Sequence, residues 1–336
     1  MIGVCVVGSG RAGMIHAKNF AGNVPGAKLI AMVDPVEDVA RSACKELGIE
    51  THYSSYEQAL DNASIDAFVV VSPTKFHMQT VKDLACAGKH VLCEKPMAMT
   101  EEECETMIKA SDENGTILQI GFMRRFEQSF VHAKETVDSG VIGDVVMVRS
   151  NTRGPSIPQP WMYDIKASNG PLAEVNSHDI DTLRWFTGSE FDTVFAAGGN
   201  YRSPGAVKDY PDFYDNVIMA ATFKNGMQGM IDGAQGVGYA YDSRVEVLGT
   251  KGCVFIGRIA DNSVVTCTAD SKHGSYPLVG SWRQLFIDAY LNEDRDFIQC
   301  ILTGRMPRVT GHDGKMAVKV VNAGNKSIKE KQKVIV

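Results

Sequence analysis

A short stretch, His90-Val-Leu-Cys-Glu-Lys-Pro96, contains the first residues whose types and order could do chemistry. Its apolar and β-branched residues predict a buried strand that ends at the proline. The proline also restricts Lys95 to extended backbone, so its ammonium group projects from a fixed place. Ligands of open α/β sheets bind beyond the carboxyl ends of the strands, where Lys95 could polarise an oxygen of a bound molecule. The alternative is a solvated pair of Glu94 and Lys95 at a strand end.

A second group of candidates lies on a helix predicted between Leu172 and Phe186. Glu174, His178 and Asp181 follow one another at spacings of four and three residues, which places them on one helical face. A carboxylate beside an imidazole can orient and tune it, so His178 could accept a proton in a reaction. A solvated acidic stripe gives the same pattern. Two such ligands on one helix are too few for a metal ion, and we expect none.

The elements that must position Lys95 begin with a glycine-rich turn between a predicted strand and a predicted helix. Its six residues are Gly8, Ser9, Gly10, Arg11, Ala12 and Gly13. This G-x-G-x-x-G pattern, in this setting, is typical of dinucleotide-binding folds. Gly8 permits the tight turn, Gly10 lets the backbone approach a pyrophosphate, and Gly13 lets the helix pack closely on the strand. The helix N-terminus offers N–H groups to the anion.

An acidic residue, Asp34, ends the next predicted strand about 20 residues after Gly13. A carboxylate at this place accepts hydrogen bonds from the ribose hydroxyls and repels a 2′-phosphate. No arginine follows immediately, so NAD is favoured over NADP. Flavin enzymes and, in looser form, methyltransferases share the glycine pattern, but the full α/β alternation and Lys95 disfavour a methyltransferase.

The alternation of strands and helices continues to Gly121. The strand predicted at 65–71 ends at Ser72-Pro73, a loop that suits the cofactor's ribose. His77 opens the next helix, where it could touch the cofactor or simply pack. Six strands alternating with helices over about 120 residues predict an N-terminal Rossmann domain, residues 1–121, with a doubly wound parallel sheet.

Residues 122–336 predict a second, α+β domain. Its strands are expected at 194–197, 215–223, 227–234, 243–249, 252–259 and 263–268. Hairpin signals such as Lys224-Asn-Gly-Met227 separate them, so the sheet should be large and mostly antiparallel. Helices at 281–302 and 314–329 should end the chain. A sheet covered by helices on one face leaves the other open to a second copy, which predicts a homo-oligomer.

The composition excludes several classes of protein. A chain of 336 residues with 44% hydrophobic and 22% charged residues is an ordinary globular protein of two-domain size. Its net charge of −6 gives no reason to expect nucleic acid or an anionic membrane as partner. No signal peptide or membrane span is evident, and the eight cysteines are scattered without C-x-x-C. We therefore expect a cytoplasmic protein with reduced cysteines.

The whole chain resembles the Gfo/Idh/MocA oxidoreductases, and among them the inositol dehydrogenases. The stretches that carry the resemblance are the glycine turn, Ser72-Pro73 with His77, Glu94-Lys95-Pro96, Gly121-Phe-Met-Arg-Arg-Phe126, His178-Asp-Ile-Asp181, Tyr241-Asp-Ser-Arg-Val-Glu-Val247 and Asp313-Gly314. It implies NAD-dependent oxidation of a secondary hydroxyl on a cyclic polyol or sugar by a homodimer or homotetramer. It also implies that Lys95 polarises the reacting oxygen and that His178 is the general base, with Glu174 beside them.

The resemblance and the patterns together give two sets of candidate residues. The expected cofactor-binding residues are Gly8, Ser9, Gly10, Arg11, Ala12, Gly13, Asp34, Ser72, Pro73, His77, Glu94 and Lys95. The expected substrate residues are Lys95, Met123, Arg124, Arg153, Glu174, His178 and Tyr241.

One departure leaves the substrate open. Inositol dehydrogenases usually have aspartate four residues before the catalytic histidine, where this chain has Glu174, whose carboxylate reaches about 1.5 Å further. The Pro-rich loop 153–161 also differs from a plain inositol enzyme. A glycoside 3-dehydrogenase is therefore the main alternative. A non-catalytic nicotinamide-sensing regulator and an oxidoreductase that never releases its nucleotide are further ones, although a sensor needs neither Lys95 nor His178.

Overall fold

The computed structural model describes residues 1–268, 270 and 273–336, and the chain divides into two compact units. The first unit consists of Met1–Glu127 and Ile287–Val318, and the second of Gln128–Phe286 and Lys319–Val336. This division differs from the predicted domains 1–121 and 122–336, because residues 287–318 return to the first unit before the chain ends in the second.

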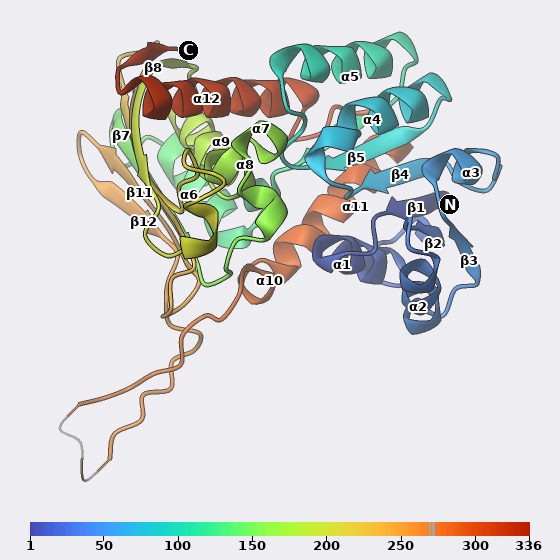
Figure 1. The fold of residues 1–336 in the computed structure, drawn as a ribbon, viewed down its shortest axis with the longest axis horizontal. Helices are drawn as coiled ribbons and strands as arrows, with labels where there is room; N and C mark the ends of the chain where they lie inside the picture. Colours follow the sequence, from blue (N-terminus) through green and yellow to red (C-terminus); the bar gives the residue numbers. More distant parts are fainter. Residues whose placement is uncertain (269, 271–272) are drawn as a thin grey trace. The chain divides into compact units, whose positions relative to one another are not determined.

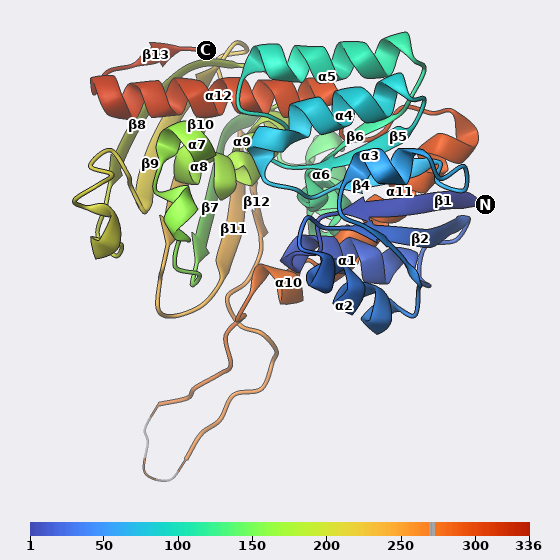
Figure 2. The ribbon, with the colours of Figure 1, turned by 45° about the vertical axis from the view of Figure 1, so that its right-hand side comes forward.

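The first unit contains a six-stranded sheet in the order β3-β2-β1-β4-β5-β6, and its neighbouring strands are all parallel. The strands are β1 (Ile2–Val7), β2 (Ala27–Val33), β3 (Thr51–Tyr53), β4 (Ala67–Val70), β5 (His90–Glu94) and β6 (Leu118–Gly121). The helices between them are α1 (Arg11–Phe20), α2 (Glu37–Leu47), α3 (Tyr56–Leu60), α4 (His77–Cys86) and α5 (Glu101–Glu113). Figure 2 shows α1 and α2 on one side of the sheet and α4 and α5 on the other. The predicted doubly wound parallel sheet is confirmed.

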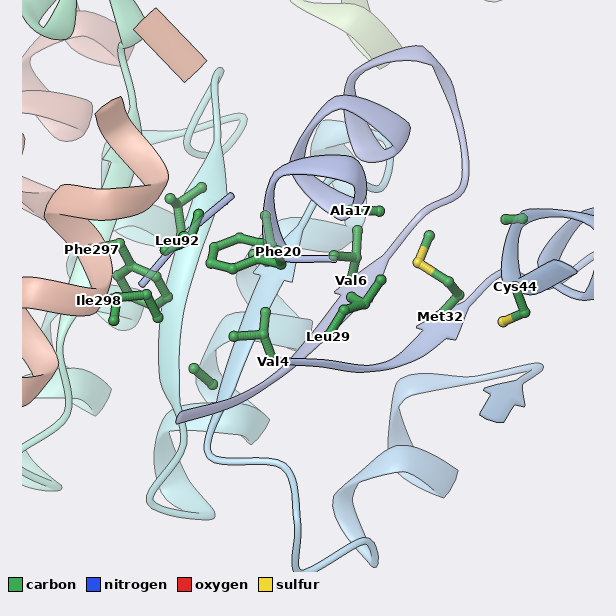
Figure 3. Packing of buried hydrophobic residues seen from close by; sticks show 14 residues of the cluster. Val4, Val6, Ala17, Phe20, Leu29, Met32, Cys44, Leu92, Phe297 and Ile298 are labelled. Atoms are coloured by element: carbon green, nitrogen blue, oxygen red, sulfur yellow. The ribbon is translucent and has the colours of Figure 1, made fainter. Parts of the chain in front are cut away.

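The core of the first unit explains why the chain returns to it. Helix α11 (Ile287–Thr303) contributes Phe297 and Ile298 to a cluster of buried residues that also contains Val4, Phe20 and Leu92 (Figure 3). Phe297 and Ile298 are completely buried. Removing one such side chain from water contributes about 1.5–3 kcal/mol, so α11 belongs energetically to the parallel sheet. Its predicted helical pattern could not indicate which domain it packs against.

The second unit contains a seven-stranded sheet in the order β12-β11-β7-β10-β9-β8-β13. The strands are β7 (Val145–Gly154), β8 (Phe191–Gly199), β9 (Asn216–Phe223), β10 (Gln228–Gln235), β11 (Asp242–Gly249), β12 (Cys253–Ile256) and β13 (Val334–Ile335). In the described part of the chain only β7 and β10 pair in parallel, and the other neighbours are antiparallel. The predicted large, mostly antiparallel sheet is confirmed.

The two faces of this second sheet differ in what covers them. Its helices are α6 (Gln128–Asp138), α7 (Ile165–Ser168), α8 (Gly170–Glu174), α9 (Ser177–Thr187), α10 (Trp282–Leu285) and α12 (Gly311–Glu330), of which α12 begins in the first unit. Helix α9 packs on β7, and Ser327 of α12 accepts a hydrogen bond from the backbone of β8. On the opposite face, Phe195, Ile218 and Phe255 are exposed to solvent.

Two predicted elements of the second unit are wrong. The single helix expected from Leu172 to Phe186 is broken into α8 and α9, because the chain turns at Val175 and Asn176. The strand expected at 263–268 is absent; among the described residues of this segment, isolated bridges such as Thr266 to Ser275 join its two sides. Figure 1 shows the segment, which follows β12, as an extended arm of the second unit. No helix in the described residues is long and apolar enough to cross a membrane.

Candidate functional site

The turn after β1 has the backbone geometry that a dinucleotide requires. Gly8 has φ +105°, and a Cβ there would lie 2.8 Å from the carbonyl oxygen of Val71. A Cβ on Gly13 would lie 1.8 Å from the carbonyl oxygen of Gly8, so α1 could not approach the turn with any other residue at this position. Gly10 instead faces open space, with no atom within 4 Å of its would-be Cβ. The backbone of Gly10 and the start of α1 at Arg11 and Ala12 are therefore open to a pyrophosphate.

Asp34 lies directly beside this turn. Its Oδ2 accepts a hydrogen bond of 2.9 Å from the backbone N–H of Ser9, and its Oδ1 accepts one of 3.0 Å from Val36. These two bonds fix the carboxylate at the carboxyl end of β2, as expected for a group that binds ribose hydroxyls.

The loop after β4 supplies the other side of the nucleotide-binding region. The hydroxyl oxygens of Ser9 and Ser72 are buried but have no hydrogen-bond partner in the described part of the protein. Buried hydroxyls normally have partners, so these two are available to a group that binds here. Pro73 is exposed next to Ser72.

His77 is a packed histidine rather than an open one. Its ring nitrogens lie 2.6 Å from the carbonyl oxygen of Ser72 and 3.0 Å from that of Pro96. Burial lowers the pKa of His77, so the imidazole is neutral and donates to one carbonyl at a time. His77 therefore ties the loop at Ser72 to the turn that contains Lys95, and its expected role moves from cofactor contact to support.

Glu94 and Lys95 stand at the end of β5, as predicted. Glu94 is buried, and its Oε2 accepts a hydrogen bond of 2.9 Å from the backbone N–H of Lys95. Its other oxygen lies 3.3 Å from Nε2 of His16. Lys95 is half-buried. Glu94 is thus a buried support of the turn and not the solvated strand-end carboxylate of the alternative interpretation.

The predicted site did not include three buried polar residues of the first unit, His16, Glu293 and Asp294. His16 lies on α1 and the two acids on α11, and all three are fully buried around Glu94. A signal existed in α11, because Glu293 falls on the same helical stripe as the buried Tyr290 and Phe297. An acid on an apolar stripe needs a partner, but the sequence does not name it.

In the second unit, the first turn of α9 holds His178. The neighbouring Asp179 is completely buried and accepts hydrogen bonds from three side chains: Ser150 and Thr152 of β7, and Asn176, which precedes the helix. A Cβ on Gly233 would lie 2.2 Å from Oδ1 of Asn176, so β10 also approaches this turn closely. Asp179 therefore fastens the start of α9 to the sheet and fixes where His178 projects.

The remaining second-unit candidates are spread more widely than expected. Glu174 ends α8, so it does not share a helical face with His178 and Asp181, which both belong to α9. Tyr241 is buried against Phe286, with ring centroids 6.3 Å apart.

Arg153 lies on the other face of the sheet. Ser150 and Thr152 point to α9, and side chains alternate along a strand, so Arg153 points away from α9. It pairs with Asp232 on β10 and borders a hollow of about 310 Å³ that is also lined by Arg244 and Phe255. The structure therefore does not bring Arg153 together with His178, and its expected role at the substrate loses support. In the first unit, Met123 and Arg124 form a buried 3₁₀ turn after β6.

The parallel sheet, the glycine turn open at Gly10, and Asp34 at the end of β2 define an NAD-binding Rossmann domain. Residues 2–122 match the family model described as an oxidoreductase family with an NAD-binding Rossmann fold, and residues 130–255 match the corresponding C-terminal domain. The chain belongs to the Gfo/Idh/MocA family, and it is an NAD-dependent dehydrogenase.

Named relatives match nearly the whole chain. A myo-inositol 2-dehydrogenase of Thermotoga maritima is 35% identical over 98% of this chain and 97% of its own length. A scyllo-inositol 2-dehydrogenase (NAD(+)) of Bacillus subtilis is 33% identical over 96% of this chain and 93% of its own. The crystal structure of scyllo-inositol dehydrogenase from Lactobacillus casei with NAD(H) and scyllo-inositol superimposes with a TM-score of 0.91 at 29% identity, covering 100% of this chain and 99% of that one.

Replacing Asp34 with alanine is expected to change the choice of nucleotide. The substitution removes the acceptor for ribose hydroxyls and the charge that repels a 2′-phosphate, so the ratio of kcat/KM for NAD to that for NADP should fall about 10-fold or more. Steady-state kinetics with both nucleotides measure this ratio. Asp38→Ala is the control, because Asp38 is exposed in the first turn of α2 and pairs only with Arg41 among the described contacts. An unchanged ratio in Asp34→Ala would mean that Asp34 does not read the ribose.

Proposed function

We propose that the chain oxidises a secondary hydroxyl of a cyclic polyol, an inositol in the first instance, with NAD as the hydride acceptor. The observation that carries this proposal is the similarity to named inositol dehydrogenases over nearly the full length of the chain, which includes both units. The buried support of Lys95 and the fixed start of α9 agree with it, because a dehydrogenase needs positioned proton-transfer groups.

We assign the acid–base chemistry to two residues. When bound, NAD supplies the acceptor for the hydride. His178 takes the proton of the reacting hydroxyl, and Lys95 stabilises the charge that develops on its oxygen. Glu94 fixes the main chain at Lys95, and Asp179 fixes that at His178. Both reactive side chains thus stand on anchored ends of regular elements, as precise catalysis requires.

The other candidate residues fall into a group proposed to bind the cofactor and a group proposed to bind the substrate. The cofactor is assigned to the turn from Gly8 to Gly13, to Asp34, and to the loop at Ser72 and Pro73. The substrate is assigned to Met123, Arg124, Glu174 and Tyr241 together with Lys95 and His178. For Arg153 we propose a different role, described below.

A glycoside 3-dehydrogenase is the second candidate function. The observation that favours it is Glu174, which replaces the shorter aspartate usual in inositol dehydrogenases and which ends α8 instead of continuing the helix of His178. A longer carboxylate on a separate helix can meet a different pattern of hydroxyls. A nicotinamide-sensing regulator without catalysis finds no comparable support, because sensing needs neither Lys95 nor His178.

The experiment that tests the proposal is the formation of reduced nicotinamide from NAD with myo-inositol, scyllo-inositol, glucose and a set of aryl and C-linked glucosides. Turnover on free inositols is the expected result. Turnover on glucosides alone would replace it with the 3-dehydrogenase and make Glu174 and the loop 153–161 the specificity elements. No turnover on any of them, with NAD binding measured, would reject both.

We also propose that a second copy of the chain covers the exposed face of the second sheet. Phe195, Ile218 and Phe255 stand on it together with the ion pair of Arg153 and Asp232, and Phe255 is 77% exposed. Apolar side chains and a charged pair on one open sheet face suit a contact with a second copy, because an isologous contact can bury both kinds of group. Sedimentation velocity should give a dimer or tetramer, and a monomer at micromolar concentration would contradict it.

A further inference from the structure

Four titratable side chains are buried together beneath the turn that contains Lys95. His16 comes from α1, Glu94 from the end of β5, and Glu293 and Asp294 from α11. All belong to the first unit, and none exposes more than 5% of its surface. Burying charges is costly unless they are paired, so this arrangement needs a purpose or a compensation.

His16 is held between two carboxylates. Its Nδ1 lies 2.6 Å from Oδ1 of Asp294, and its Nε2 lies 3.3 Å from Oε1 of Glu94. The side-chain amide of Asn19 donates a hydrogen bond of 2.8 Å to the other oxygen of Asp294. Both partners of His16 are carboxylates, unlike the two carbonyls beside His77, and only an imidazolium donates to both of them at once. Burial alone lowers the pKa of His16, but Asp294 and Glu94 outweigh it and raise the pKa well above its ordinary value.

Glu94 connects His16 to the backbone of Lys95. One carboxylate oxygen, Oε1, lies 3.3 Å from Nε2 of His16, and the other, Oε2, accepts a hydrogen bond of 2.9 Å from the backbone N–H of Lys95. The carboxylate packs against the backbone of Gly121, where an added Cβ would lie only 3.0 Å from its Cδ, so this place is open to Glu94 only because residue 121 is glycine. The position of the Lys95 main chain therefore depends on the charge and hydrogen bonding of His16.

Glu293 differs from its neighbours in its hydrogen bonding and its protonation. Both of its carboxylate oxygens are buried without a hydrogen-bond partner in the described residues. Burial and the charge of Glu94 raise its pKa well above the ordinary value, although His16 opposes them. Glu94 and Asp294 already outnumber the single imidazolium, and no donor faces the oxygens of Glu293 in the described residues, so its protonated form is favoured.

We propose that His16 and Glu94 form a buried ion pair that positions Lys95 for catalysis, and that Glu293 stays protonated so that Glu94 remains the charged partner. The proposal rests on the function proposed above, since it gives His16 a role through Lys95. His16 is a positioning residue and touches neither substrate nor cofactor in this scheme.

A bound cation is the competing account of the same residues. The ligand atoms of His16, Glu94 and Glu293 lie within 4.8 Å of one another, a spacing that a metal ion could use. Nδ1 of His16 meets Asp294 in either account, but the ion pair also needs a proton on Nε2, which would block a metal there, and the raised pKa of His16 favours that proton. The observations therefore favour the ion pair, and metal content becomes one outcome of the test.

The test compares two isosteric substitutions. Glu94→Gln should lower kcat about 10- to 100-fold, because its amide N–H₂ would face the N–H of His16 and shift the turn, while the Kd for NAD changes less than about 3-fold. Glu293→Gln replaces a protonated carboxyl with a neutral amide and should keep kcat within about 3-fold of the wild type. The double variant His16→Gln/Glu94→Gln should have a kcat no lower than that of the slower of its two single variants, His16→Gln and Glu94→Gln. The reason is that its two amides can form a hydrogen bond with each other. Glu113→Gln, on the exposed end of α5, is the control.

The stability of the protein gives a readout that does not need a substrate. Glu293 faces Glu94, His16, Asp294 and Asp296, and its folded pKa is raised. A raised folded pKa means that its contribution to stability is complete below the unfolded pKa and is lost as the pH rises through the folded pKa. Glu293→Gln removes this loss, so its Tm relative to the wild type should rise as the pH increases above the ordinary pKa of a glutamate, about 4.3.

Four results would overturn the proposal: wild-type kcat in Glu94→Gln, an equally large loss of kcat in Glu293→Gln, a Tm difference that is flat with pH, or one equivalent of zinc or manganese that Glu293→Gln releases. If the wild type oxidises none of the polyols, the function proposed above fails, but the Tm series still decides whether Glu293 is protonated.

Discussion

Lys95→Ala is expected to lower turnover by about two to four orders of magnitude while NAD still binds. The substitution removes the ammonium group that would stabilise the developing alkoxide, and it leaves the backbone N–H that Glu94 holds. The glycine turn and Asp34 are also unchanged, so the nucleotide should retain its affinity. Single-turnover absorbance of reduced nicotinamide gives the rate, and titration calorimetry gives the Kd for NAD.

Two companion variants sharpen this result. Lys109→Ala removes an exposed lysine of α5 that pairs only with Glu113 in the described structure and should leave kcat unchanged. Lys95→Arg keeps the positive charge but replaces a compact donor with a planar one, so it should restore only part of the rate. Turnover within about 10-fold of the wild type in Lys95→Ala would remove Lys95 from the mechanism.

The first sheet was predictable because its signals are local. Most of its strands are apolar runs bounded by turns, with the short β3 as the exception, and the glycine turn, Asp34 and the Glu94-Lys95-Pro96 turn all follow strand ends. The carboxyl ends of parallel strands meet at one edge, so local order in the sequence translates directly into proximity. For this reason the residues that the sequence proposed for the nucleotide stand at the carboxyl ends of β1, β2, β4 and β5, whereas His77 is packed between two backbone carbonyls.

The features that the sequence did not indicate depend on distant contacts. The break between α8 and α9 occurs at Asn176, whose amide is pressed against Gly233 of another strand and bonded to Asp179. Asparagine favours helix starts, so the residue type carried a hint that the apolar periodicity concealed.

The buried ion pair is a second case of the same kind. His16 and Asp294 are separated by 278 residues, and neither has a neighbour in sequence that suggests the other. Arg153 is a third case: the sequence placed it in the loop 153–161, whereas β7 continues to Gly154, and only the register of β7 decides which face its side chain takes, since a shift by one residue reverses it. Local chemistry was predictable, whereas pairing across the fold was not.

His178→Ala is expected to lower turnover by about two to four orders of magnitude, because no other group would take the hydroxyl proton. The fold should persist, since Asp179 and its three partners hold the start of α9 independently of the imidazole ring. Rates with and without added imidazole, at constant ionic strength, measure the effect. Partial recovery of turnover by imidazole is expected if the missing group is the base.

Two further variants separate the base from its support. His132→Ala removes an exposed histidine of α6 in the same unit and should have no effect on rate. Asp179→Asn turns one of three accepted hydrogen bonds into a clash of donors, so it should lower both Tm and kcat without recovery by imidazole. A slow His178→Ala that imidazole cannot rescue would resemble Asp179→Asn, and His178 would then be a structural residue of α9. Recovery in His178→Ala alone makes it the base, because only a missing proton acceptor can be replaced from solution.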